Sequence, residues 1–374
     1  MNNHKKVIIS CLVIYIIISI IICITYYLVF ISAFPRNKSM FEWKCWNNVC
    51  NNVFSGNTMM DFTFISEKEA WAVGSLGSIS RWNGERWESI PSPTHNTLHA
   101  VVFNSPNDGW AVGYENTILH WDGSNWLQYI PTVNIANPQP KDVMFEDIKF
   151  SNSTDGWISG AWDINNGIEG IILHWDGLSW NFVEEKTNMI SSSNCLCSIY
   201  VISTNNVWIV GDSETPNVSI IHWNGTNWCD VQNVIGAKGS LHGIQALGAD
   251  DVWIIGEDDI LLSTKLHDWY SRGFILHWNG QQWTKNELPE RWNDETIYNQ
   301  FTKTPKSQIL LSMFVQSPQD IIVGGNVQAQ WNGKEWSEIE VPEDDILIFD
   351  IEMNPNGRLF AITSNGQYLG LYGK

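Results

Sequence analysis

The sequence contains few charged residues, and cations are the scarcer kind. Charged residues make up 16% of the 374 positions, with 21 Lys and Arg against 40 Asp and Glu, which gives a net charge of −19. Nucleic acids and anionic lipid surfaces are bound mainly through Lys and Arg. The composition therefore excludes nucleic acid and anionic lipid as partners of the folded part of the chain.

Cysteine is also sparse and irregularly placed. The sequence has no C-x-x-C pair and no Cys/His zinc spacing, which argues against a structural zinc site. Two cysteines lie in an apolar run near the N-terminus, and the other five are Cys45, Cys50, Cys195, Cys197 and Cys229. An odd set of this kind does not form a disulfide framework, although Cys45 and Cys50 could pair if the chain is exported.

Charge is absent altogether from residues 7–33, a run of 27 mostly apolar positions. About 20 such residues cross a bilayer as a helix, whereas a signal-peptide core has only about 7–15. We therefore expect a short tail at 1–6, a transmembrane signal-anchor helix at 7–33 and a linker at 34–40; cleavage after Ala33 is the alternative. Lysines on both sides of the span leave the orientation open. The two-lysine tail before an uninterrupted apolar run favours export, with the folded part on the extracytoplasmic side.

The chain beyond the linker is built from one repeat, which is clearest at residues 98–131. Four runs of β-branched and aromatic residues are separated by turn residues, and they span 98–103, 109–113, 117–121 and 125–130. We name these runs strands A to D. The pattern is typical of a four-stranded antiparallel meander. One meander cannot bury both of its faces, whereas copies arranged radially can.

Tryptophan marks the copies of this repeat. In the reference copy Trp110 lies in strand B, Trp121 in C and Trp126 in D, and five copies contain all three. A sixth copy has Ile322 at the B position, and a seventh stops before its strand D. The predicted repeats span 59–91, 98–131, 145–184, 196–232, 241–286, 309–341 and 348–374. Residues 41–49 are the candidate for the missing strand and would close the last repeat without an unpaired edge.

We therefore predict an all-β fold: a seven-bladed β-propeller of four-stranded antiparallel blades over 41–374, preceded by one transmembrane helix. The repeat resembles the WD40/YVTN/BNR-like propeller repeats, especially those of photosystem II stability/assembly factor-like proteins. The resemblance is carried by Gly109–Gly113, Thr117–Leu119, Asp122, Gly123 and Trp126. The repeat departs from the sialidase Asp-box, S-x-D-x-G-x-T-W, which never occurs intact. The resemblance implies the fold and leaves the function open, because propellers host many unrelated activities.

In a propeller the A–B and C–D turns lie on one face, and the B–C and D–A loops lie on the other. The linker would enter strand D at the C–D end and reaches about 25 Å when extended, so we expect the C–D face towards the membrane. The longest loops, 257–273 and 285–308, fall on the opposite, membrane-distal face. Loops elaborated on one side of a scaffold are typical of recognition surfaces.

Three tryptophans outside the repeat pattern lie in the distal loops. They and their aromatic or cationic neighbours are Trp162, Trp269, Tyr270, Arg272, Arg291 and Trp292. Exposed aromatic and Arg side chains are typical of protein-binding hot spots and of platforms that stack sugars. We predict that these six residues form a binding surface. The alternative is that the tryptophans pack the loops onto the blades.

Two further sets of residues have a chemical interpretation. Asp61, Asp147 and Asp350 occupy one level of the innermost strand A, where three carboxylates could bind a cation, with Ca²⁺ the best match. The alternative is that each carboxylate accepts backbone hydrogen bonds from the next blade. Four histidines recur in strand C: His120, His174, His222 and His277. Each belongs to a different blade, too far from the channel to converge on a metal, so we interpret them as structural repeat residues.

The function that these features favour is a membrane-anchored, non-enzymatic binding module for a protein or a glycan. The alternatives are a sialidase-like propeller glycoside hydrolase and an assembly factor for a membrane complex. Glycoside hydrolysis would need two carboxylates about 5–9 Å apart across the scissile bond, and a carboxylated sugar would need an arginine cluster. Only Arg272 and Arg291 fall in distal loops. No motif in the sequence names a ligand, a substrate or a cofactor.

Overall fold

The computed structural model describes most of the chain beyond residue 37. The described residues are 38–46, 54, 57–131, 143–163, 167–183, 195–212, 219–231, 234, 239–263, 268–289, 307–343 and 346–373; the side chains of 259–263 and 268–270 are left out. All of them except Lys38 belong to one compact unit, Ser39–Lys374. No helix in these ranges is long and apolar enough to cross a membrane. The predicted anchor at 7–33 lies outside them.

Each repeat contributes its strands in the order A to D. The first repeat contains β2 (Met59–Ser66), β3 (Glu69–Gly74), β4 (Ile79–Trp82) and β5 (Trp87–Ile90), with the short 3-10 turn η2 (Ser75–Gly77) after β3. The second contains β6 (Leu98–Ser105), β7 (Asp108–Gly113), β8 (Thr117–Trp121) and β9 (Trp126–Gln128). The third contains β10 (Val143–Asn152), β11 (Asp155–Asp163), β12 (Ile168–Trp175) and β13 (Trp180–Phe182). The fourth contains β14 (Cys195–Ser203), β15 (Asn206–Asp212), β16 (Ser219–Trp223) and β17 (Trp228–Asp230).

The remaining repeats follow the same order. The fifth contains β18 (Ser240–Gly248), β19 (Asp251–Ser263), β20 (Asp268–Trp278) and β21 (Trp283–Glu287). The sixth contains β22 (Leu310–Ser317), β23 (Asp320–Gly325), β24 (Ala329–Trp331) and β25 (Trp336–Glu340). The last contains β26 (Ile348–Met353), β27 (Leu359–Thr363) and β28 (Tyr368–Gly373), and its fourth strand is β1 (Lys38–Cys45). In the reference repeat, each strand end lies within two residues of its predicted position.

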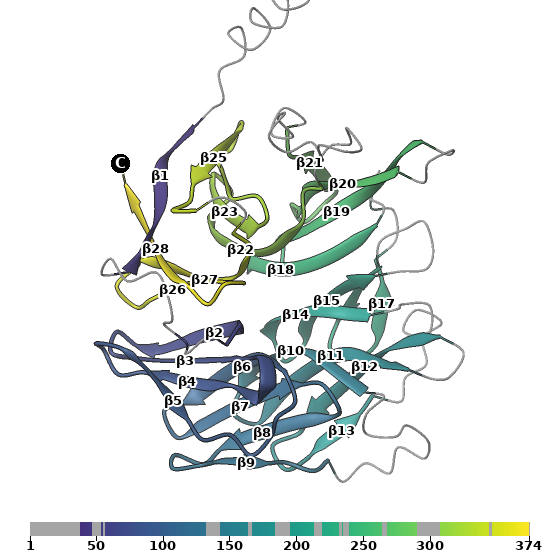
Figure 1. The fold of residues 1–374 in the computed structure, drawn as a ribbon. Coiled ribbons are helices and arrows are strands. Elements are labelled where there is room, and N and C mark those ends of the chain that lie inside the picture. The colour runs from purple at the N-terminus through teal and green to yellow at the C-terminus, as the bar shows by residue number, and fades with distance from the viewer. Residues whose placement is uncertain are drawn as a thin grey trace, which may run out of the picture. The chain divides into compact units, whose positions relative to one another are not determined.

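The strands form five four-stranded sheets and one eight-stranded sheet, whose order is β22-β23-β24-β25-β1-β28-β27-β26. In the larger sheet β1 pairs antiparallel with β28, with Phe41 opposite Gly373 and Cys45 opposite Leu369. The strand that the sequence analysis assigned to the gap in the last repeat is therefore found there. Figure 1 shows β1 beside β28, near the marked C-terminus.

The repeats form a closed series around a common centre. Each strand A contacts the strand A of the next repeat, and β26 contacts β2. In Figure 1 the A strands lie centrally, and strands such as β5, β9, β17 and β21 lie at the periphery. The core consists of clusters that each join two neighbouring repeats, and one of them joins the last repeat to the first. A β-sheet that is covered on both faces explains the nearly continuous burial of strands such as β3 and β7.

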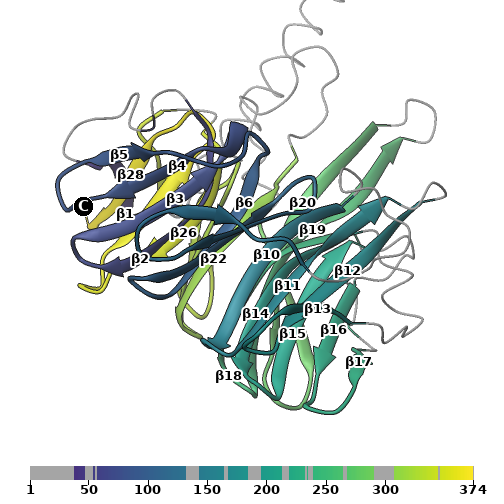
Figure 2. The same cartoon turned by 90° about the horizontal axis from the view of Figure 1, so that it is seen from below.

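Two segments that the sequence predicts as distal loops are extended hairpins. In the fifth repeat β19 and β20 pair from Val252 opposite Trp278 out to Ser263 opposite Asp268, and Figures 1 and 2 show this hairpin projecting beyond its neighbours. In the third repeat β11 and β12 pair out to Asp163 opposite Ile168. The inserted residues continue the strands because the ladder satisfies their backbone groups.

The cysteines divide into bonded and free. Cys45, at the end of β1, is disulfide-bonded, and its partner lies outside the described residues, as Cys50 does. Within the described ranges Cys195, Cys197 and Cys229 are free thiols.

Candidate functional site

A trio of side chains recurs at the A–B end of the repeats. In the second repeat Asp108, the first residue of β7, accepts a hydrogen bond from Trp110 Nε1 at 3.1 Å and lies 2.9 Å from His120 Nε2 on β8. The imidazole of His120 stacks on Trp110 with ring centroids 4.2 Å apart. The same stacking occurs in the next three repeats, in the pairs Trp157–His174, Trp208–His222 and Trp253–His277. The prediction that these histidines are structural repeat residues is confirmed.

The first and sixth repeats keep the trio with other residues. In the first, Arg81 takes the histidine position, forms an ion pair with Glu69 at 2.6 Å and lies over Trp71. In the sixth, Gln330 Nε2 donates to Asp320 Oδ1 at 2.9 Å, beside Ile322 at the tryptophan position. Both repeats therefore keep the polar contact, but the sixth has lost the large ring.

The last repeat keeps no member of the trio. Arg358 stands at the acidic position, Phe360 replaces the tryptophan, and Gly370 is paired with Phe360 where the histidine would be. Space over Gly370 is partly taken by Trp46, because a Cβ built on Gly370 would lie 3.3 Å from that indole. The junction between the last and first repeats is thus built differently from the others.

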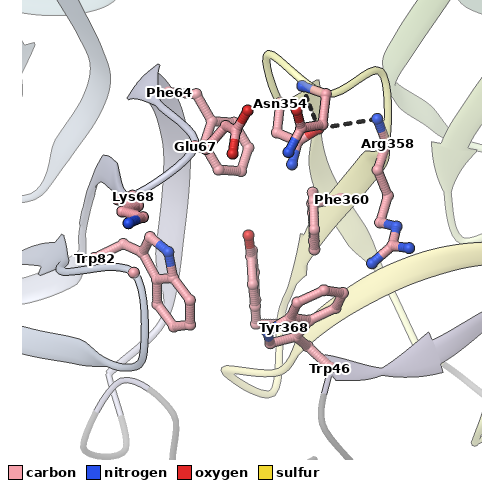
Figure 3. Close-up of a pocket in the computed structure, with 11 residues that line it drawn as sticks. Trp46, Phe64, Glu67, Lys68, Trp82, Asn354, Arg358, Phe360 and Tyr368 are labelled. Atoms are coloured by element: carbon pink, nitrogen blue, oxygen red, sulfur yellow. Dashed lines mark hydrogen bonds between the residues drawn. The ribbon is translucent and has the colours of Figure 1, made fainter.

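A pocket of about 380 Å³ opens at this junction, which we call the closing pocket (Figure 3). Aromatic rings form its walls, namely Trp46, Phe64, Trp82, Phe360 and Tyr368. Its rim is formed by residues of the A–B and C–D turns, namely Gly84 and the polar residues Glu67, Lys68, Asn354, Asn356 and Arg358. The N-terminal end of β1 lies at the same edge of the sheet, because Phe41 pairs with Gly373 while Phe360 pairs with Gly370.

Tyr368 places a polar group inside the closing pocket. Its side chain is 2% exposed, and Figure 3 shows the hydroxyl pointing into the space between Trp82 and Phe360. Within the described part of the chain this hydroxyl has no hydrogen-bond partner. Burial raises the pKa of Tyr368, so the hydroxyl stays protonated and is available as a donor.

A second pocket of about 300 Å³ lies at the junction between the sixth and last repeats, and we call it the adjacent pocket. Its apolar lining includes Ile322, Met353 and Leu371. The equivalent junction between the second and third repeats holds Trp110 packed against larger rings. Ile322, Met353 and Leu371 are smaller than Trp110, Phe150 and Trp175 at the equivalent positions, and they leave the space open.

One turn separates the two pockets, and Asn356 and Arg358 line both. Asn354 Oδ1 accepts hydrogen bonds from the backbone N–H groups of Asn356 at 3.1 Å and Arg358 at 2.9 Å. The Arg358 guanidinium lies 5.2 Å from the Trp46 ring centroid and 5.5 Å from that of Tyr372. No carboxylate of the described residues pairs with it. The turn therefore holds an exposed cation between two pockets that both have apolar side chains in their walls, an arrangement suited to an anionic group with apolar neighbours.

The residues that the sequence singled out in the distal loops are placed only in part. Trp162 is half-buried, packs against Phe182 with ring centroids 5.8 Å apart, and donates to Glu169 Oε2 at 3.3 Å. Arg272 pairs with Glu287 at 2.7 Å. Both contacts lie within one repeat and favour the packing alternative for these two side chains.

The other four predicted residues are not placed as side chains. Trp269 and Tyr270 lie in β20, opposite Leu261 and Ile260, with side chains that are not described. Arg291 and Trp292 lie outside the described residues. A binding surface formed by these four residues stays a prediction.

The three strand-A aspartates each reach across to the next repeat. The backbone N–H groups that donate to them are Val101 to Asp61 at 2.7 Å, Ile199 to Asp147 at 3.0 Å and Phe62 to Asp350 at 3.4 Å. In the part of the chain that the structure describes, no group of three His, Cys, Asp or Glu side chains could hold a metal ion. The geometry favours the alternative in which the carboxylates link neighbouring strands.

Lys149 supplies a cation to these carboxylates. Its Nζ lies 3.2 Å from Asp147 Oδ1. Burial opposes its charge, but the carboxylates of Asp147 and Asp61 outweigh burial and raise the pKa of Lys149. Burial and the charge of Asp350 raise the pKa of Asp61. An ammonium group therefore balances the charge at the level where the sequence predicts a metal cation.

Comparison with known proteins rests on the fold. No family of known proteins matches the sequence, and no curated protein is detectably similar to it. Among solved structures, YCF48 bound to a D1 peptide has a TM-score of 0.61 and 16% identity, covering 90% of this chain and 99% of its own. Virginiamycin B lyase from Staphylococcus aureus with quinupristin has a TM-score of 0.62 and 13% identity, covering 88% and 99%. The WD40 β-propeller domain of Doa1 has a TM-score of 0.57 and 12% identity, covering 89% and 97%.

The fold is a β-propeller. Each repeat described above is therefore a blade, and the trio of side chains lies where the A–B turn of one blade meets the next. The similar propellers include a peptide-bound protein and a lyase, so the fold does not decide the function of this chain. Both pockets escaped the sequence analysis, and the signal that could have found them is the loss of the strand-B tryptophan at Ile322 and Phe360.

Proposed function

We propose that this chain is a membrane-anchored, non-enzymatic binding module, a seven-bladed propeller whose last blades recognise a protein partner. The observation that carries the proposal is the pair of pockets on either side of the 354–358 turn, which share Arg358. Concave apolar sites with a few polar groups are the common form of binding sites. Aromatic and Arg side chains also dominate the energetics of protein interfaces.

The chemistry of the pockets favours binding over hydrolysis. Among the residues that the structure describes, Glu67 is the one carboxylate that lines the closing pocket, and Asp320 is the one that lines the adjacent pocket. Asp320 already accepts a hydrogen bond from Gln330. Glycoside hydrolysis needs two carboxylates about 5–9 Å apart across one bond, so neither pocket supplies the required pair. Recognition of a protein also agrees with the peptide bound to YCF48, a propeller of similar fold.

The membrane anchor is part of this proposal. The apolar run at 7–33 is long enough to span a bilayer, and the disulfide at Cys45 supports export to an oxidising compartment. β1 begins at Lys38, within the predicted linker, and its N-terminal end lies at the edge of the sheet that carries the pockets. The pockets would then face a partner close to the membrane surface, and an assembly factor for a membrane complex is one form that such a module takes.

A crosslinking experiment tests the proposal. A photo-crosslinking amino acid replaces Asn356, between the pockets, in the full chain within native membranes. A matched control carries it at Lys334, an exposed residue in a C–D turn of the sixth blade. We expect a discrete protein adduct from position 356, none from 334, and loss of the adduct when Phe360→Trp fills the closing pocket.

Equal adducts at the two positions, or none at either, would refute a binding site at the last blades. An adduct that glycosidases remove and proteases do not would replace the protein partner with a glycan.

A further inference from the structure

We infer that the two pockets receive a single extended protein segment in which two large apolar side chains flank an acidic residue. This inference rests on the proposed function and names the chemistry of the partner. It joins three features of the site: two pockets with aromatic or aliphatic side chains in their walls, the Arg358 cation between them, and the Tyr368 hydroxyl, and neither of these two groups has a polar side-chain partner among the described residues.

The pockets lie where the chain has withdrawn its own large side chains. Trp110 fills the equivalent position between the second and third blades, where it packs against Trp175 and Trp180. Phe360 and Ile322 occupy this position in the last two blades and line the closing and adjacent pockets. Aromatic and large aliphatic side chains bury enough area to drive association when they enter such a space. Each pocket therefore takes one apolar side chain of the partner.

The group between the two side chains is set by Arg358. Its guanidinium lies over Trp46 and Tyr372 and has no carboxylate partner within the described residues. The chain as a whole has a net charge of −19, and Arg358 is an exposed cation at the rim of both pockets. Lys68 adds a second cation at the rim of the closing pocket. A carboxylate of the partner would form a charge-assisted hydrogen bond with Arg358.

The donor inside the closing pocket selects an acceptor. The Tyr368 hydroxyl points into the pocket (Figure 3) and stays protonated because burial raises the pKa of Tyr368. A backbone carbonyl of an extended segment supplies such an acceptor. Alternate side chains of an extended segment also point to the same side, which lets two of them enter pockets separated by a turn.

Synthetic peptides test the inference with the full chain in detergent. Each peptide has ten residues, capped at both ends, with Phe and Leu separated by one to five positions, a Glu between them and Gly or Ser elsewhere. Affinity is measured by calorimetry. We expect one spacing to bind best, and Glu→Lys in that peptide to weaken binding about ten-fold or more, because an ion pair with Arg358 is lost.

Three variants connect the peptide to the residues. Arg358→Gln should abolish the difference between the Glu and Lys peptides. Phe360→Trp fills the closing pocket and Ile322→Trp fills the adjacent pocket, and both restore the tryptophan that other blades carry. Each variant should therefore abolish the gain in affinity that one of the two apolar peptide side chains provides. Lys334→Gln is the control, because Lys334 is an exposed turn cation of the sixth blade that lines neither pocket.

Affinity that is unchanged in both tryptophan variants, or equal affinity for the Glu and Lys peptides, overturns the inference. If every peptide fails while the adduct at position 356 forms and depends on Phe360, the inferred chemistry is wrong and the proposed function stands. If the adduct also fails, both are wrong.

Discussion

The protonation of Glu352 makes the stability of this propeller depend on pH. Burial, followed by the negative charge of Asp350, raises the pKa of Glu352 from its ordinary 4.5 to about 8, against the opposing attraction of Lys149. The folded state therefore keeps a proton that the unfolded state releases. Since the folded pKa is the higher one, this contribution to stability is complete below pH 4.5 and is lost as the pH rises to about 8.

Replacing Glu352 by Gln removes this dependence, because the amide has nearly the same shape and stays neutral. Each unit of pKa shift corresponds to about 1.4 kcal/mol, so the full shift sets an upper limit of about 5 kcal/mol. Glu352 is only partly buried, and partial exposure weakens such effects. We expect Glu352→Gln to match the parent near pH 5 and to be more stable by about 1–2 kcal/mol near pH 8.5.

Urea denaturation of the full chain between pH 5 and pH 9 measures the effect. The midpoint concentration should fall with rising pH in the parent and fall less in Glu352→Gln, with unchanged slope of free energy against urea. Glu85→Gln, at an exposed turn of the first blade, is the control and should follow the parent. Parallel curves for the parent and Glu352→Gln would refute the assignment of a raised pKa to this residue.

Three further changes test other parts of the structure. Asp147→Ala removes the acceptor of the Ile199 N–H and should lower the free energy of unfolding by about 2–4 kcal/mol in urea denaturation. Gly160→Ala places a Cβ 2.0 Å from the carbonyl oxygen of Met144 and should cost about 2–4 kcal/mol, seen as a lower Tm. Burial lowers the pKa of His242, but the hydrogen bond to Glu257 and the negative charge of Glu257 outweigh burial, so the pKa is raised. The stability from His242 is present below pH 6.5 and is lost as the pH rises, so His242→Gln should destabilise the protein more at pH 5.5 than at pH 8.

Each of these predictions has a matched control. Glu85→Ala changes an exposed carboxylate, and an equal loss of stability would contradict the role given to Asp147. Gly248→Ala adds a Cβ with no atom within 4 Å, so an equal fall in Tm would show that the close contact at Gly160 is unimportant. His95→Gln alters an exposed histidine; the same pH dependence there would remove the case for His242.

The fold was predictable because its determinants are local and repeated. Trp110, His120 and their copies recur at fixed positions, and each holds a defined contact with the strand beside it. The position of β1 was predictable because one repeat lacked a strand and the chain offered one candidate for it. Trp253 and Trp278 marked the inner parts of β19 and β20, but the extension of these strands through 257–273 was expected as a loop, because the extension is stabilised by the pairing of its two strands with each other.

The pockets were not predictable, because they depend on residues that are distant in the sequence. Phe360 and Gly370 show that the last blade lacks its tryptophan and its histidine, but the sequence does not show what fills the space. Trp46 comes from the opposite end of the chain, and Tyr368 turns its hydroxyl into the cavity. Trp162 stands out in the sequence as a candidate binding residue, but the structure shows that it packs against Phe182 of its own blade.

The pockets and the packed Trp162 together suggest that a binding site in a repeat protein of this kind lies where a blade lacks a recurring packing residue. A marker residue that recurs is needed for packing at every junction, so a blade that loses it must fill the space or leave a cavity. The first blade fills it, with Arg81 paired to Glu69 beside an intact Trp71. The last two blades leave cavities, and the turn between them carries an arginine where other blades carry an acceptor. The site has therefore lost large packing residues and gained a cation, and the proposed binding role would give both changes a function.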